Sequence, residues 1–201
     1  MKGMENLGTI AAVILAFFAK EFWDIYKKRR GRKINASDMT KSIEFDVNIN
    51  DELSTLRDRY DFNRAALYDF SNGSGSLSGM SFKNVSMRYE RVDLITKPII
   101  RNYQNIPCSN IASLLLELNN KGMLEVKNDV SDVEHEVAIQ HQRVFGVIQS
   151  YYFRLGGNLI NGCVCLSTTT DVVKLTLDDI NDIKAACDRI LWNKEQMPRQ
   201  R

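Results

Sequence analysis

The side chains best suited to metal binding or nucleophilic chemistry are two histidines and four cysteines. His135 and His141 are six positions apart, which on a helix turns them about 120° away from each other, so they are badly placed to share a metal ion. Cys163 and Cys165 lie on one side of a predicted strand, but two thiols without further ligands do not make a zinc site. We therefore predict no metal site and four free, buried thiols.

A stretch rich in glycine and serine, residues 73–79, is the one candidate phosphate loop. It lacks the Gly-x-Gly-x-x-Gly spacing, and it leads into a predicted strand instead of a helix N-terminus that could bind an anion. The sequence also contains no nucleophile elbow, metal-binding helix motif or kinase signature. We predict that the protein is not an enzyme, has no catalytic residues and needs no cofactor.

Hydrophobic periodicity predicts the elements that would position these residues. The last helix is the clearest, because Thr176 and Asp179 resemble a capping box and an apolar stripe follows at helical spacing. Residues 43–49 alternate between apolar and polar types, and this pattern is compatible with either a strand or a linker. The pattern predicts an α+β fold with helices packed on an antiparallel sheet. We expect helices over 48–61, 109–120, 132–145 and 176–191, and strands over 64–70, 81–92, 123–126, 148–155 and 159–167.

The chain begins with an apolar segment that a basic block follows. Residues 7–26 are enough to cross ~30 Å of hydrocarbon at 1.5 Å per residue, and six of the seven residues 27–33 are cationic. The positive-inside rule then places everything after residue 26 in the cytosol. We predict a single-pass protein of the inner (plasma) membrane with a cytoplasmic domain. An interfacial helix, a buried helix and a cleaved signal peptide are the alternatives.

Residues near the end of this segment suit the membrane–water interface. Aromatic rings favour the headgroup region, and each juxtamembrane cation contributes about 1 kcal/mol near an anionic leaflet, although a simple stop-transfer signal explains the cations equally well. Removing the six charges from the net +2 leaves −4, so we predict no nucleic-acid partner. The predicted interface residues are Lys20, Phe22, Trp23, Tyr26, Lys27, Lys28, Arg29, Arg30, Arg32 and Lys33.

The rest of the chain has the length of one domain. About 165 residues follow the basic block, which is enough for a single hydrophobic core. The predicted organisation is an N-terminal tail over 1–6, a transmembrane helix over 7–26, a basic juxtamembrane linker over 27–47, an α+β domain over 48–193 and a C-terminal tail over 194–201.

Two segments of the predicted domain resemble a divergent GAF-type sensor domain of phage and bacterial proteins. They are the strand 65–70 with the Ser71-Asn72-Gly73 that follows it, and the later Ser86-Met87-Arg88-Tyr89-Glu90. The corresponding family stretch reads as a strand, Phe-His-Asn-Gly and then Ser-x-x-Tyr-Glu, so Ser71 stands here where the pattern has histidine. The resemblance covers residues 48–193.

This resemblance implies a small-molecule pocket against the sheet, beneath the loop at Asn72. Turn geometry at Asn72 and an exposed strand face at Tyr89 and Glu90 are the alternative explanation for the polar residues. The implied polar contacts are Asn72, Ser86, Tyr89 and Glu90, and the implied apolar walls are Tyr68 and Phe70.

The overall architecture is also similar to that of T-even phage holins, which have one N-terminal span, a domain of this type and a C-terminal helix like residues 186–191. In those holins the domain is periplasmic and disulfide-bonded. Here a basic block follows the span, and no cysteine lies near Ser150 to pair with Cys187.

Two hypotheses follow for the function. The first is a membrane-anchored GAF-like sensor, of phage or bacterial origin, that binds a small-molecule ligand or a protein partner. The alternative is a holin-type lysis protein whose oligomerising spans permeabilise the inner membrane under control of the soluble domain. Small residues along the predicted span, such as Gly8, Ala12 and Ala16, are compatible with a homo-oligomer and with a lone anchor.

Overall fold

The computed structural model describes residues 20–21, 23, 36–71, 83–128, 136–157 and 160–195. Ser42–Arg201 is the compact unit that contains the sheet, and the residues before Ser42 form a separate unit. Apart from Lys20, Glu21 and Trp23, the predicted span over 7–26 lies outside the described residues. Among the helices that are described, none combines the length and apolar character needed to cross a membrane.

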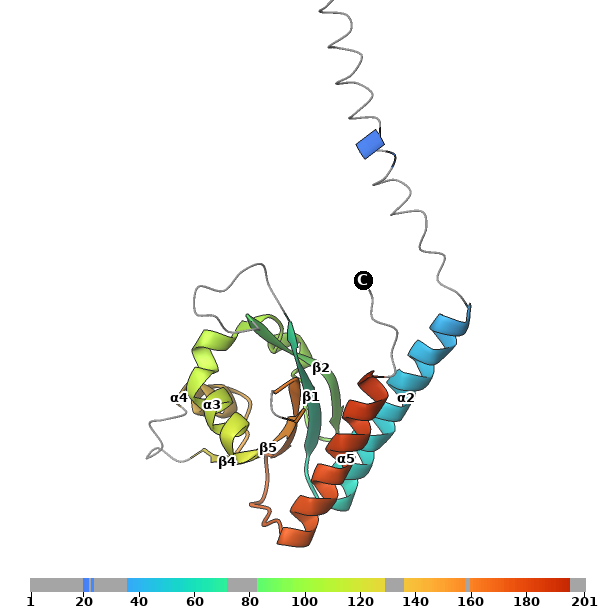
Figure 1. Ribbon diagram of the computed structural model, residues 1–201. Coiled ribbons are helices and arrows are strands. Elements are labelled where there is room, and N and C mark those ends of the chain that lie inside the picture. The colour runs from blue at the N-terminus through green and yellow to red at the C-terminus, as the bar shows by residue number, and fades with distance from the viewer. Residues whose placement is uncertain are drawn as a thin grey trace, which may run out of the picture. The chain divides into compact units, whose positions relative to one another are not determined.

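An antiparallel sheet lies at the centre of the domain (Figure 1). It has six strands in the order β3-β2-β1-β6-β5-β4. Alternate residues of a strand point to opposite faces, and here both faces are covered. Strand β6 is accordingly buried at every position. The strands are β1 (Arg64–Ser71), β2 (Asn84–Val92), β3 (Ile106–Pro107), β4 (Met123–Lys127), β5 (Gln149–Leu155) and β6 (Gly162–Thr168).

Two long helices, α2 (Ala36–Arg59) and α5 (Leu177–Glu195), pack side by side on one face of the sheet (Figure 1). Their apolar stripes meet strand residues such as Phe153 and Leu166 in one core. Ion pairs between the helices, Arg59–Asp182 at 2.7 Å and Arg189–Glu52 at 2.6 Å, lie at the exposed edge of this contact. The stripe residues are Ile49, Leu53 and Leu56 of α2 and Ile183, Ala186 and Ile190 of α5.

Shorter elements cover the other face, where Leu114, Leu118 and Ile139 pack against the sheet in a second core. Helix α3 ends at Gly122, whose φ of 75° gives the left-handed cap that glycine adopts without strain. These elements are η1 (Ile100–Asn102), η2 (Cys108–Ile111), α3 (Ala112–Lys121) and α4 (Glu136–Val144). The domain therefore has three layers, with the sheet between the helix pair and this second cover.

The predicted order of elements is confirmed, and the main correction concerns α2. The helix begins at Ala36 and not at residue 48, so part of the predicted basic linker is helical. The alternating pattern of residues 43–49 combines two helical repeats: Phe45 and Ile49 face the core, whereas Ile43 and Val47 are half-exposed on the opposite side. Residues 109–111, expected as the first turn of α3, are instead part of the 3-10 helix η2.

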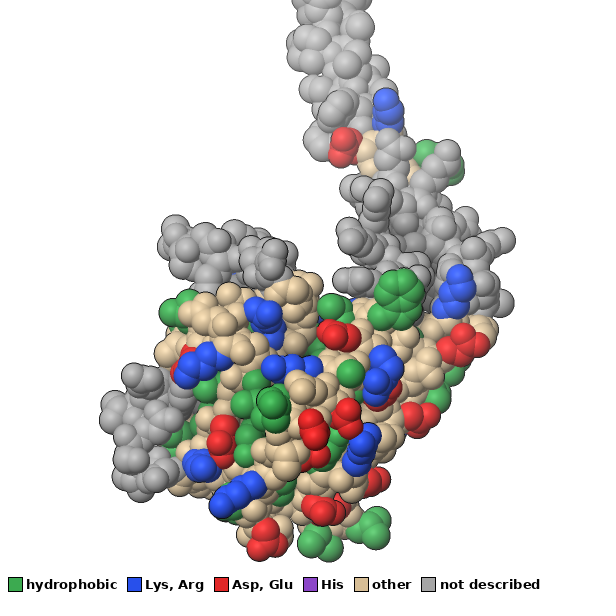
Figure 2. All heavy atoms as spheres, turned by 60° about the horizontal axis from the view of Figure 1, so that its bottom comes forward, with side chains coloured by type: hydrophobic (Ala, Val, Ile, Leu, Met, Phe, Trp, Pro, Cys, Tyr) green, Lys and Arg blue, Asp and Glu red, His purple; other side chains and the backbone are tan. Residues whose placement is uncertain are grey.

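Several local predictions match the structure. The Thr176 hydroxyl and the Asp179 carboxylate exchange hydrogen bonds with each other's backbone N–H groups, as in a capping box. Cys108, Cys163, Cys165 and Cys187 are all free and buried. On the face shown in Figure 2, acidic and basic side chains are interspersed, with hydrophobic side chains between them.

Gly162, in the middle layer, provides a test of the sheet packing. A Cβ atom at this position would lie 2.5 Å from the backbone carbonyl oxygen of Tyr68. We expect Gly162→Ala to lower the free energy of unfolding by about 1–3 kcal/mol, because the β1–β6 contact must widen. Gly157→Ala is the matched control, since a Cβ there meets no atom within 4 Å. Chemical denaturation measures both variants, and equal stabilities would contradict this account of the packing.

Candidate ligand-binding site

A small apolar cavity lies between the sheet and the cover formed by η2 and α3. Its volume is about 70 Å³. Strands β1, β2, β5 and β6 provide the floor, and η2, α3 and the segment after η1 provide the roof. The lining residues are Tyr68, Phe70, Val85, Tyr103, Ile106, Asn110, Ile111, Leu114, Leu115, Tyr152 and Cys163.

Strand pairing brings the floor residues together from distant parts of the sequence. Tyr68 lies directly opposite Cys163 in the β1–β6 ladder, and Phe70 lies opposite Val85 in the β1–β2 ladder. Because directly paired residues point to the same face of a sheet, these four side chains share one surface. The roof residues of α3 repeat at helical spacing, so the cavity depends on the same periodicity that forms the core.

The cavity wall is neutral. None of its lining residues carries a charge at neutral pH, because burial raises the pKa of both Tyr68 and the Cys163 thiol well above their usual values. Cys163 therefore remains a thiol and is a poor nucleophile. A charged ligand would lose its hydration here without an opposite charge in the wall, so the cavity suits neutral molecules.

Hydroxyl groups are the main polar feature of this wall. The Tyr68 ring meets the Tyr103 ring edge-on at a centroid distance of 5.9 Å, and Tyr103 also contacts Phe145 at 5.7 Å. Tyr68 is buried and lines the cavity. A tyrosine hydroxyl can donate to an acceptor atom in the cavity, and the Asn110 side chain is a second polar group there.

A β-bulge separates the predicted site residues. Leu67 pairs with Tyr89, whereas Tyr68 pairs with Met87, so Arg88 is the extra residue on β2. The bulge turns Tyr89 to the α2 side of the sheet, where its hydroxyl donates to Asp46 and its ring lies 6.4 Å from that of Phe45.

The predicted site is therefore only partly brought together. Tyr68 and Phe70 line the cavity, as expected for apolar walls. Ser86, Tyr89 and Glu90 are not among its lining residues, and the Ser86 hydroxyl accepts from the backbone N–H of Asn105 at 2.8 Å.

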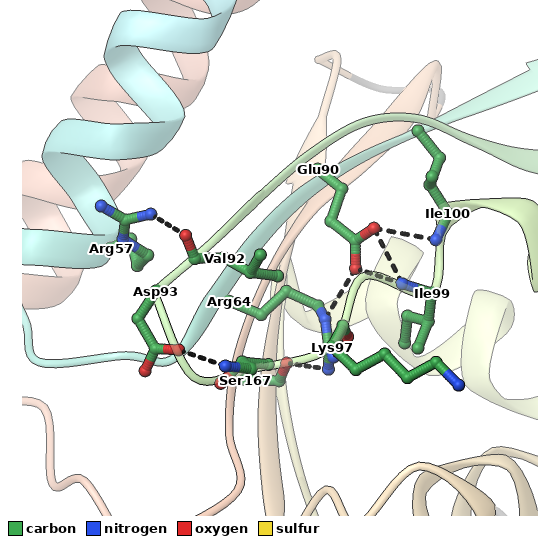
Figure 3. Close-up of polar contacts among 10 residues, drawn as sticks. Arg57, Arg64, Glu90, Val92, Asp93, Lys97, Ile99, Ile100 and Ser167 are labelled. Atoms are coloured by element: carbon green, nitrogen blue, oxygen red, sulfur yellow. Dashed lines mark hydrogen bonds and ion pairs between the residues drawn. The ribbon is translucent and has the colours of Figure 1, made fainter.

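Glu90 forms a buried ion pair with Arg64 instead of lining the cavity (Figure 3). Nε of Arg64 lies 2.8 Å from the Glu90 carboxylate, and both side chains are 3% exposed. The same carboxylate accepts from the backbone N–H groups of Ile99 at 2.9 Å and Ile100 at 2.8 Å. Arg64 also donates to the carbonyl oxygen of Lys97 at 2.9 Å. This pair holds the chain segment that leads to Tyr103.

Other predicted residues lie outside the described part of the chain. Asn72 does, and so do all of the predicted membrane-interface residues except Lys20 and Trp23, which are exposed. His135 is also outside, and the side chain of His141 is not described. Across the described ranges, no cluster of His, Cys, Asp or Glu side chains could hold a metal ion.

Sequence reasoning missed most of the roof and part of the floor. Leu114, Leu115 and Ile111 were identifiable as a helix stripe but not as cavity residues, because a stripe facing a void has the same spacing as one facing a filled core. Tyr103 belongs to an irregular segment with no periodic signal. Tyr152 lies opposite Cys165 in the β5–β6 ladder. Because Tyr151 and Tyr152 alternate along the strand, the pattern could have indicated which of these two tyrosines points to the cavity side of the sheet.

No family model matches the sequence, and no curated protein matches it. Solved structures do match. The PixJ GAF domain of Thermosynechococcus elongatus in its blue-light absorbing form is 11% identical with a TM-score of 0.60, over 79% of this chain and 88% of that chain. The domain has a GAF fold.

Two further structures agree. A far-red cyanobacteriochrome photoreceptor is 9% identical with a TM-score of 0.61, over 85% of this chain and 98% of that chain. A GAF domain/HD domain protein from Geobacter sulfurreducens is 14% identical with a TM-score of 0.58, over 76% of this chain and 93% of that chain. At these identities the likeness shows the fold alone, so the predicted GAF-like α+β domain is confirmed. The similarity to holins stays a prediction.

Removal of the Glu90 charge tests whether this residue is structural. We expect Glu90→Gln to lower the free energy of unfolding by about 3–5 kcal/mol, because Arg64 is left as an uncompensated buried charge. Asp182→Asn, which breaks the exposed pair with Arg59, should cost less than about 1 kcal/mol. Urea unfolding of the two variants measures the difference. A Glu90→Gln variant as stable as the parent would show that the pair is not buried in solution.

Proposed function

We propose that the protein is a non-enzymatic, membrane-anchored sensor whose GAF-fold domain binds a small, neutral, mostly apolar molecule. The observation that carries this proposal is the cavity under α3, which has apolar walls and includes the phenol of Tyr68 among its lining groups. Binding sites for small molecules typically combine apolar walls with a few polar groups that set orientation. The cavity on this face of the sheet has that composition.

The size of the cavity limits the ligand. Pockets for drug-sized molecules usually enclose about 300–1,000 Å³, and this cavity of about 70 Å³ is well below that range. The similar structures include photoreceptors, but a chromophore with several rings does not fit the space that these side chains leave. The proposed ligand is therefore roughly the size of a single aromatic ring.

Membrane anchoring rests on the sequence. The apolar segment 7–26 and the cations of residues 27–33 support one span with the domain in the cytoplasm. An anchored sensor would keep its ligand-binding domain near the bilayer, where apolar molecules are concentrated. The origin in a phage or a bacterium and the presence of a protein partner belong to the same proposal.

Three small probes test the cavity in the full chain reconstituted in lipid nanodiscs. Phenol should shift the methyl NMR signals of Leu114 and Ile111 in a saturable way, toluene should do so more weakly, and benzoate should not, because the wall offers no positive charge. Tyr68→Phe should weaken phenol binding roughly 2- to 12-fold, the equivalent of one hydrogen bond, and leave toluene unchanged.

Two tryptophan variants distinguish the cavity from partition into lipid. Leu115→Trp places a large ring in the cavity and should abolish the phenol shifts. Leu116→Trp is the matched control, because Leu116 is 64% exposed on α3 and does not line the cavity. Phenol shifts that persist in Leu115→Trp, or that are absent from the parent protein, would refute the proposed site.

Topology is testable with one added cysteine after Arg201. The four native cysteines are buried, so a membrane-impermeant maleimide should react with the added thiol alone in the folded protein. We expect labelling only after the inner membrane is lysed, since the basic block keeps the domain in the cytosol. Labelling of cells whose outer membrane alone is permeabilised would place the domain in the periplasm and favour the holin-type alternative. The parent chain without the added cysteine is the control.

A further inference from the structure

Two adjacent apolar side chains protrude from the loop between β2 and η1. Leu94 and Ile95 are fully and 84% exposed, respectively. A single exposed leucine is ordinary, but two neighbouring large apolar side chains held away from the domain point to a contact surface. We refer to Leu94 and Ile95 as the tip.

The backbone of the tip is held in place by hydrogen bonds on both sides. Asp93 accepts from the N–H groups of Ile95 at 3.1 Å and Thr96 at 2.7 Å, and from the Asn63 side chain at 2.7 Å. The Thr96 side chain and these bonds together lower the pKa of Asp93 to about 2, so its carboxylate is ionised at neutral pH. Arg64 anchors the far end of the loop at the carbonyl oxygen of Lys97.

A loop fixed in this way cannot fold back to cover its own apolar side chains. The tip is therefore pre-organised, and a partner that binds it has little ordering entropy to overcome.

Ile95 separates two surface hollows. The first, about 500 Å³, contains Asp58, which forms an ion pair with Arg57 at 2.6 Å, and the carboxylate of Asp93, so its net charge is negative and we call it the acidic hollow. The second, about 380 Å³, contains Lys97 and is called the basic hollow. Its other charged lining group, Arg64, is already neutralised by Glu90. The remaining lining residues of the basic hollow are Ile95, Thr96, Ile99, Val144, Phe145 and Thr169.

The basic hollow has the chemistry that the tip needs. Val144 is 76% exposed at this hollow, and Phe145 lies beside it, so both can receive an apolar side chain. The Asp93 carboxylate beside the tip has the opposite charge to Lys97. This surface carries an apolar protrusion beside a negative charge and an apolar hollow beside a positive charge. A two-fold rotation places the protrusion of each copy against the hollow of the other, so the surface is complementary to itself.

We propose that two copies of this chain associate through this surface, with the tip of each copy seated in the basic hollow of the other. In this arrangement Leu94 and Ile95 contact Val144 and Phe145 of the second copy, and Asp93 approaches its Lys97. The interface is independent of the proposed ligand, because it uses neither the cavity nor any of its lining residues.

Cysteine cross-linking between differently tagged copies tests the contact directly in the full chain. One copy carries Ile95→Cys and the other carries Val144→Cys, and the native cysteines stay silent because they are buried. Mild copper–phenanthroline oxidation in native membranes should give a disulfide-linked heterodimer, detected by its mass and by both tags. Leu94→Asp added to the first copy should slow its formation several-fold by placing a charge against the apolar wall.

The matched control pairs Ile95→Cys with Leu116→Cys, an exposed position that lines neither hollow. Equal cross-linking rates for the two pairs would refute the interface, because random collision would then explain both. So would an absence of cross-linking when maleimide still reacts with each introduced thiol. If the cysteine at position 95 is protected from maleimide by a lipid bilayer but not by detergent, the tip contacts the membrane and the proposal fails.

Discussion

The buried ion pair between Arg64 and Glu90 is the interaction on which both candidate sites depend. Each side chain comes from a central strand, and each also fixes the backbone of the segment after β2: Glu90 at Ile99 and Ile100, and Arg64 at Lys97. That segment presents the tip at one end and Tyr103 at the other. A buried ion pair contributes little net stability, but loss of one partner is costly, so the geometry is strongly enforced.

The bulge at Arg88 makes this arrangement possible. Without the extra residue, the strict alternation of β2 would send Glu90 toward the helix pair and Tyr89 toward the cavity side. The bulge exchanges them, so that Tyr89 bonds to α2 and Glu90 meets Arg64. One irregular residue thus decides which polar group stabilises which layer.

The cavity and the tip lie on the same cover of the sheet but differ in how they are held. The cavity is a gap in a core of tyrosine, leucine and isoleucine side chains, where burial alone determines the protonation state of Tyr68 and Cys163. The tip is held by charge-assisted bonds at the surface. An apolar ligand and a second copy of the chain would therefore be recognised by separate parts of one domain, joined by residues 97–103.

The sequence by itself determined the order and type of the main helices and strands and their arrangement as helices packed on an antiparallel sheet, because hydrophobic periodicity depends only on local spacing along a helix or a strand. It also determined the Thr176–Asp179 cap and the free cysteines, which need no distant partner to be identified. The start of α2 was misjudged because two interleaved helical repeats in residues 43–49 imitate a strand. Only the tertiary structure decided that Tyr68 and Phe70 share a cavity with Tyr103 and Tyr152, that Glu90 belongs to Arg64, and that Leu94 and Ile95 remain exposed. Those outcomes depend on strand register, on a bulge and on contacts between residues far apart in the chain, and local spacing carries no information about them.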